Sequence, residues 1–213
     1  MARLKTATRT LHNAGVRRVI GLFPSHKNQR MVPWESQIER DFFYDCEFRK
    51  DVVRYEAQPR EFTYWLEGRS ALYTPDAELI LTDGTIAYCE TKPQEKADAP
   101  ELQAKWQAIA TALTKEGFAF WMVRDTDLRR GHRAQNLRLL YRYVAWPGSE
   151  QVAKAVGLHL PRGTLAVEQV IRQFRALGLD AGCVYHALFT KNLECDLESA
   201  PINIHTSVWR SES

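Results

Sequence analysis

The pattern of apolar and polar positions over residues 75–93 predicts a β-hairpin. Two apolar runs of strand length flank the pair Asp83-Gly84. An Asp-Gly pair between two such runs is the strongest short-range hairpin signal that a sequence carries. The other predicted elements can be arranged around this hairpin.

Charged side chains stand at the open end of the predicted hairpin. Because side chains alternate between the two faces of a strand, Glu90 and Lys92 share one face. A two-residue turn would place Asp76 on the opposite face, whereas a three-residue turn brings it level with them. We therefore expect a three-residue turn with Gly84 in the left-handed region, or else a bulge near Pro75.

A long helix and two strands are expected between Pro33 and the hairpin. The apolar residues of the helix recur near the 3.6-residue period: Trp34, Ile38, Phe42, Phe43 and Cys46. Glu35 and Glu39 are four residues apart and lie on one side of this helix, with Glu39 at the edge of its apolar stripe. Alternation predicts strands over residues 52–59 and 62–66, and residues 19–23 fit a short edge strand.

A helix, a buried strand and another helix are expected after the hairpin. The helices cover residues 101–116 and 134–145, each with one apolar face. Residues 118–123 are all apolar, which predicts a strand buried on both faces. The order of elements predicts a mixed α/β domain with a central sheet.

The pattern changes after Pro147-Gly148-Ser149, which reads as a linker. Three short helices and a β-wing are expected beyond it: residues 150–156, 164–176, 181–191, 193–196 and 202–209. This pattern predicts a small winged helix-turn-helix domain over residues 149–213, after a first domain over residues 1–148. The last helix carries Tyr185, His186 and Lys191 and would be the recognition helix if DNA binds there, with a protein-docking role as the equal alternative.

Positive charge is concentrated in two places, although the formal net charge is only +3. Residues 1–34 contain seven Lys and Arg residues and no acid, which favours a phosphate-contacting arm over a solubilising tail. A second basic cluster lies at residues 129–133. The candidate phosphate contacts are Arg17, Arg18, Lys27, Arg30, Arg129, Arg130 and Arg133.

The composition is that of an ordinary globular protein, with 45% hydrophobic and 26% charged residues among 213. No apolar run approaches the roughly 20 residues needed to span a bilayer. The four cysteines are scattered, without a Cys-x-x-Cys pair or histidines at zinc spacing. We therefore expect reduced cysteines in a cytoplasmic protein.

Two carboxylates and one lysine on a sheet face have two interpretations. They can form a solvated salt bridge, which contributes less than about 1 kcal/mol. They can also hold Mg²⁺, because hard divalent cations bind oxygen ligands and two converging carboxylates are the usual minimum. Pro-Asp at residues 75–76, followed by Glu-x-Lys at residues 90–92, is similar to the signature of the PD-(D/E)xK nuclease superfamily.

Five stretches, in this order along the chain, together resemble the TnsA endonuclease subunit of heteromeric cut-and-paste transposases. The stretches are Phe23-Pro24-Ser25-His26-Lys27-Asn28, Trp34-Glu35-Ser36-Gln37-Ile38-Glu39-Arg40-Asp41-Phe42, Val53 with Gln58-Pro59, Tyr73-Thr74-Pro75-Asp76, and Glu90-Thr91-Lys92. The resemblance covers roughly residues 20–145. Beyond them the chain fits the family's winged-helix domain in size and pattern, and its shortness is similar to TnsA proteins of CRISPR-associated transposons.

The resemblance implies a restriction-endonuclease-like core whose catalytic set is Glu39, Asp76, Glu90 and Lys92. Many family members have Gln where this chain has Glu90, and Glu35 is the rival for the role of Glu39. The implied partners are double-stranded DNA at transposon ends, a DDE-type transposase (TnsB) that cuts the 3′ ends, and an AAA+ ATPase (TnsC). TnsA itself cuts near the 5′ ends, and a bacterial, nucleoid-associated location follows from this role.

The same resemblance implies a mechanism. Asp76 and Glu90, with the Thr91 carbonyl, would hold Mg²⁺, for which Mn²⁺ can substitute. Lys92 would orient a water molecule or stabilise developing charge, and Glu39 would anchor a second ion or its water. Two alternatives remain open: another nuclease of the superfamily, of resolvase or restriction type, or a non-catalytic DNA-binding adaptor.

Overall fold

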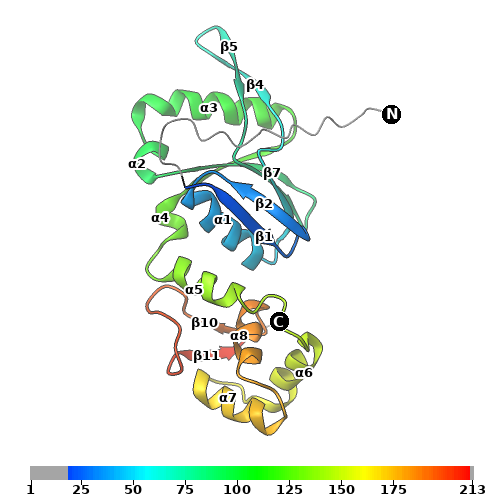
Figure 1. The fold of residues 1–213 in the computed structure, drawn as a ribbon. Helices are drawn as coiled ribbons and strands as arrows, with labels where there is room; N and C mark the ends of the chain where they lie inside the picture. Colours follow the sequence, from blue (N-terminus) through cyan, green and yellow to red (C-terminus); the bar gives the residue numbers. More distant parts are fainter. Residues whose placement is uncertain (1–18, 212–213) are drawn as a thin grey trace, which may run out of the picture. The chain divides into compact units, whose positions relative to one another are not determined.

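A computed structural model describes residues 19–211, in which helices and strands alternate in an α/β arrangement (Figure 1). The chain divides into two compact units, Met1–Leu128 and Arg129–Ser213. The expected boundary at residues 148–149 lies too late, because the helix α5 (Arg133–Tyr141) packs against α8 (Gly182–Phe189) of the second unit. None of the helices within residues 19–211 combines the length and apolar character needed to cross a membrane.

A four-stranded mixed sheet lies at the centre of the first unit, in the order β3-β6-β7-β8. β3 (Val52–Ala57), β6 (Ala77–Leu81) and β7 (Ile86–Lys92) are antiparallel neighbours, and β8 (Ala119–Arg124) runs parallel to β7. Two hairpins flank the sheet, β1 (Gly21–Ser25) with β2 (Arg30–Trp34) and β4 (Phe62–Leu66) with β5 (Arg69–Tyr73). The expected strands at residues 52–59 and 62–66 are therefore confirmed.

Helices cover the two faces of this sheet (Figure 1). The helix α1 (Gln37–Phe48) packs against β3 and β7, with Cys46 close to Cys89. On the other face, α3 (Pro100–Lys115) and the β4–β5 hairpin bury one apolar cluster: Phe62, Tyr64, Tyr73, Tyr88, Trp106, Ile109 and Leu113. The short helices α2 (Gln94–Ala97) and α4 (Asp125–Leu128) follow β7 and β8.

The register of the central hairpin confirms the prediction of a three-residue turn. The N–H of Leu81 donates to the carbonyl of Thr85 at 2.9 Å, and Gly84 adopts a φ of +85°. Ala77 pairs with Cys89, so the next position, Asp76, comes level with Glu90. Both acids therefore project to the face that also carries Lys92.

Several expectations for the first unit were wrong in detail. Trp34 ends β2 instead of opening the helix, because Ser36 caps α1 and accepts the N–H of Glu39. β8 is only half-buried along its length, because it is the edge strand of the sheet. β5 was not foreseen, since its turn at Glu67-Gly68, with both φ angles positive, lacks the usual Asn or Asp.

The second unit combines helices with a three-stranded antiparallel sheet. Its helices are α5, α6 (Ser149–His159), α7 (Val167–Ala176) and α8, and its sheet order is β10-β11-β9. The expected pairing of the last two strands is confirmed, because β10 (Leu193–Cys195) pairs with β11 (Ser207–Arg210). The remaining strand, β9 (Leu165–Ala166), pairs with β11 from the other side.

The proposed recognition helix is a core helix. Every residue of α8 except Tyr185 is buried. His186 is 3% exposed, and its ring nitrogens lie 2.7 Å from the Tyr143 carbonyl and 3.0 Å from Ser149 Oγ. A helix that is buried all round cannot present a face to a DNA groove, so α8 does not fit the role expected for it.

Candidate active site

The hairpin gathers Asp76, Glu90 and Lys92 at its open end. Lys92 Nζ lies 2.5 Å from Glu90 Oε1 and 3.6 Å from Asp76 Oδ2. Glu90 is 6% exposed, and the Asp76 and Lys92 side chains are also largely shielded. A partly buried ammonium shared by two carboxylates differs from a fully solvated surface salt bridge, which was the simpler interpretation of this sequence.

Thr91 fixes the carboxylate of Asp76. Its backbone N–H and its Oγ1 donate to Asp76 Oδ2 at 2.8 and 2.9 Å. Both bonds, and the contact with Lys92, go to Oδ2, which leaves Oδ1 available to another ligand. Thr91 thus acts here through its donors, and a role for its carbonyl stays a prediction.

Tyr73 fixes the other carboxylate. Its hydroxyl donates to Glu90 Oε2 at 2.7 Å, and both residues are buried. Sequence reasoning did not assign Tyr73 to the site, although Tyr73 closely precedes Asp76. Its position at the end of β5 becomes clear only once that unforeseen strand and its packing are known.

The electrostatics of the site show an excess of buried negative charge. Burial raises the pKa of Glu90, and the charge of Asp76 raises it further, against the opposing effects of Lys92 and Tyr73. Burial acts to lower the pKa of Lys92, but Asp76 and Glu90 outweigh it, so that this pKa lies above its ordinary value. Lys92 is therefore a protonated amine that only partly balances its two acids.

Glu39 lies on α1, close enough to Asp76 for their charges to interact. Burial raises the pKa of Glu39 to about 7, and the charge of Asp76 contributes to this increase. Its Oε2 accepts at 2.9 Å the backbone N–H of Glu35, the residue before the N-cap Ser36. Glu35 precedes α1 and does not lie on the same side of the helix as Glu39. This position makes Glu35 a weaker candidate than Glu39 for the catalytic role.

The donor set fits a hard divalent cation in its chemistry. Three carboxylates face one lysine here, and the pKa values of Glu39 and Glu90 are raised chiefly by burial, with a smaller contribution from the charge of Asp76. One oxygen of Asp76 is uncommitted. Within residues 19–211, however, no group of three or more His, Cys, Asp or Glu side chains is already arranged to hold a metal ion.

The residues predicted to contact phosphate lie in different surroundings. Arg17 and Arg18 lie outside the described residues. Lys27 Nζ donates to the carbonyls of Arg49, at 2.5 Å, and Val52, which favours a structural role. Arg30 forms an ion pair with Glu56, and Arg130 Nε lies 3.6 Å from Glu198. Arg129 and Arg133 flank the start of the second unit, and Arg133 opens α5.

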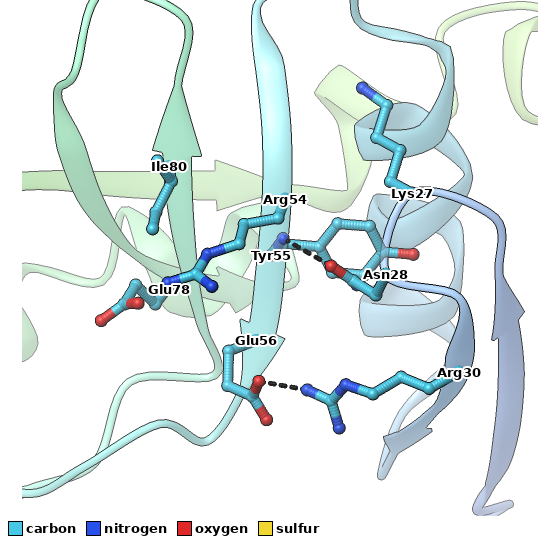
Figure 2. A pocket seen from close by; sticks show the side chains of 8 residues that line it. All are labelled: Lys27, Asn28, Arg30, Arg54, Tyr55, Glu56, Glu78 and Ile80. Atoms are coloured by element: carbon cyan, nitrogen blue, oxygen red, sulfur yellow. Dashed lines mark hydrogen bonds and ion pairs between the residues drawn. The ribbon is translucent and has the colours of Figure 1, made fainter.

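A pocket of about 280 Å³ lies beside β3 and β6 in the first unit (Figure 2). Its lining combines arginines, glutamates and one amide: Lys27, Asn28, Arg30, Arg54, Tyr55, Glu56, Glu78 and Ile80. Sequence reasoning gave Arg54, Glu56 and Glu78 no role, because short-range alternation does not show which strands become neighbours.

Comparison with known proteins adds no relative: no protein-family model matches the chain, and no curated protein is significantly similar to it. A functional assignment therefore depends on the geometry of the site and on the sequence patterns described above.

Proposed function

We propose that the chain is a magnesium-dependent DNA endonuclease and acts as the subunit of a heteromeric transposase that cuts near the 5′ ends of the element. The observation that carries this proposal is the convergence of Asp76, Glu90 and Lys92 at one end of the β6–β7 hairpin. Two carboxylates and an amine are the groups needed to hold a cation against a phosphodiester and to stabilise added charge there.

Each residue has a distinct role in this proposal. Asp76 and Glu90 would hold Mg²⁺, or Mn²⁺ in its place, together with the Thr91 carbonyl, and Glu39 would support a second ion or its water. The bound metal would supply a Lewis acid at the scissile phosphate and lower the pKa of a water molecule. Lys92 would orient the attacking water or stabilise charge on the phosphate, while Thr91 and Tyr73 keep the carboxylates in place.

The finer assignments belong to the same proposal. The first unit would be a restriction-endonuclease-like core, and the second a winged-helix domain. Because α8 is buried, we favour docking to a protein partner, a DDE-type transposase or an AAA+ ATPase, over DNA reading by that helix. Such work on DNA would take place in the bacterial cytoplasm, at the nucleoid.

Asp76→Ala tests the catalytic assignment. The variant is expected to abolish Mg²⁺-dependent 5′-strand cleavage at transposon ends when the transposase is reconstituted with its partners. Thr114→Ala, on α3 and distant in sequence from the site, serves as a control for handling and assembly. Cleavage by Asp76→Ala at the wild-type level would refute the assignment.

Two alternative functions predict different results in two further assays, DNA cleavage by the chain alone and Mg²⁺ binding. A resolvase or restriction-type nuclease of the superfamily would cut DNA without partners, whereas the proposed subunit should be nearly inactive alone. A non-catalytic adaptor would bind DNA and show no Mg²⁺ binding that depends on Asp76 and Glu90.

A further inference from the structure

The pocket beside β3 and β6 is lined by Glu78 and Ile80 of β6 (Figure 2), the strand that Asp76 immediately precedes. Glu78 lines the pocket two residues after Asp76, so their side chains point to one face. The Tyr88 hydroxyl donates to Glu78 Oε2 at 2.6 Å, and Tyr88 in turn precedes Glu90 by two residues. The far wall, at Ile80, is four residues from Asp76, or about 13 Å along the strand.

Asn28 supplies a hydrogen-bond donor that the fold does not use. Its Oδ1 accepts the backbone N–H of Tyr55 at 3.2 Å, which sets the orientation of the amide. Its Nδ2 is buried and has no hydrogen-bond partner in the described part of the chain. Buried polar groups of folded proteins are nearly always paired, so this donor at the pocket calls for an acceptor, which can be a water molecule or an oxygen of a ligand.

Arg54 supplies a second donor from β3. Its side chain lines the pocket, and no hydrogen bond or ion pair engages its guanidinium within residues 19–211. The two acids of the pocket are already engaged, Glu56 by Arg30 and Glu78 by Tyr88. The unused groups are therefore mainly donors, among them one full positive charge.

We propose that this pocket binds a backbone phosphate of the DNA strand that enters the active site, with Arg54 and the Asn28 amide donating to its oxygens. The inference rests on the proposed nuclease function and adds a substrate subsite to it. A phosphate suits the two donors, because its oxygens accept several hydrogen bonds and an arginine can donate two in parallel. The subsite would position the strand without reading its sequence.

The test measures how binding of a labelled DNA duplex to the full chain depends on salt, in EDTA so that no cleavage occurs. Loss of one phosphate contact is expected to reduce the slope of log K against log[salt] by about 0.9. Arg54→Gln should show this reduction and weaker binding. The matched control is Arg69→Gln, which removes the same charge from an exposed position on β5 and should leave the slope unchanged.

Asn28→Asp is a second, independent test of the subsite. It keeps the acceptor for the Tyr55 N–H but replaces the unused donor with a negative charge, so it should weaken DNA binding as well. If this variant proves unstable by thermal unfolding, the exposed residue Arg54 decides the matter alone. Equal slopes for Arg54→Gln and Arg69→Gln would overturn the subsite.

Failure of the subsite can be told apart from failure of the nuclease function. If the wild type cuts DNA and Arg54→Gln keeps the wild-type slope, only the subsite is wrong. If Asp76→Ala cuts normally while Arg54→Gln reduces the slope of log K against log[salt], only the catalytic assignment is wrong. Saturable binding of inorganic phosphate that needs Arg54 but does not compete with DNA would also overturn the assignment to DNA.

Discussion

The two carboxylates of the candidate site are held by two uncharged neighbours as well as by Lys92. Tyr73 and Thr91 each donate to one of the two carboxylates, while Lys92 contacts both acids. Groups of this kind orient ligands of metal sites, and their loss typically lowers metal affinity or activity about 10- to 100-fold. The hydroxyl of Tyr73 is the part of this support that a single substitution can remove most cleanly.

If the proposed function holds, Tyr73→Phe is expected to lower the cleavage rate of the reconstituted transposase about 10- to 100-fold and to raise the Mg²⁺ concentration needed for half-maximal rate. The loss of a hydrogen bond to the carboxylate also raises the pKa of Glu90, so activity should appear at higher pH. Tyr64→Phe, in the same apolar cluster, is the control. Equal Mg²⁺ and pH dependence of the two variants would contradict a positioning role.

Glu39→Gln tests the burial of an acid whose pKa is raised to about 7. Between its ordinary pKa and 7, the folded wild type holds a proton that the unfolded chain has lost. Stability of the wild type in EDTA should therefore fall as pH rises through this interval, by up to about 3 kcal/mol. Urea unfolding at pH 5 and pH 8 measures this loss of stability, which Glu39→Gln should not show. If the stability of both proteins changed equally with pH, Glu39 would not be its source.

At the level of elements, the turn of the β6–β7 hairpin decides whether the site exists. The three-residue turn sets the pairing of Ala77 with Cys89, and a register shifted by one residue would turn Asp76 to the opposite face. Gly84 makes this turn possible with a φ of +85° and open space around its α-carbon. Its contribution is thus conformational and does not come from packing.

Gly84→Ala is expected to lower the free energy of unfolding by about 1 kcal/mol, because a side chain disfavours the left-handed region. Gly84→Asn should cost less, since Asn tolerates that region better. Urea unfolding of the two variants and the wild type measures both effects. An alanine variant as stable as the wild type would show that this turn adopts another conformation.

Sequence periodicity predicted most elements of the first unit and the joining of Asp76, Glu90 and Lys92. It succeeded there because one hairpin with a strong turn signal contains all three residues. It failed for β5, and hence for Tyr73, because the Glu67-Gly68 turn carries a weak signal. It also misplaced the start of α1, since Trp34 continues the helical spacing by coincidence while Ser36 fixes the cap.

At the level of the whole molecule, two units with separate cores share one chain. The core of the second unit is built around α8, whose Gly182 lies against the ring of Trp146. A β-carbon at this position would come within 2.3 Å of Trp146 Cζ2, a contact that backbone or ring must move to relieve. The tight packing explains why a helix expected to face DNA is enclosed instead.

Gly182→Ala is expected to destabilise the second unit by about 1–3 kcal/mol through overpacking. If the units unfold separately, urea unfolding should show two transitions, with Gly182→Ala lowering only one and Gly84→Ala only the other. Fluorescence and far-UV circular dichroism can be recorded on the same samples. A single transition that both variants shift equally would show that the units unfold together.

The shared ammonium of Lys92 has a consequence for the order of events at the site. A divalent ion that binds without DNA would compete for the two acids with the tethered ammonium that already contacts both of them. A polyanion such as DNA, bound at the same end of the hairpin, would attract the Lys92 amine away from the two acids. The negative charge of Asp76 and Glu90 would then lack its partner. If the proposed nuclease function holds, substrate and ion would then each strengthen the other's binding, and magnesium would bind weakly in the absence of DNA.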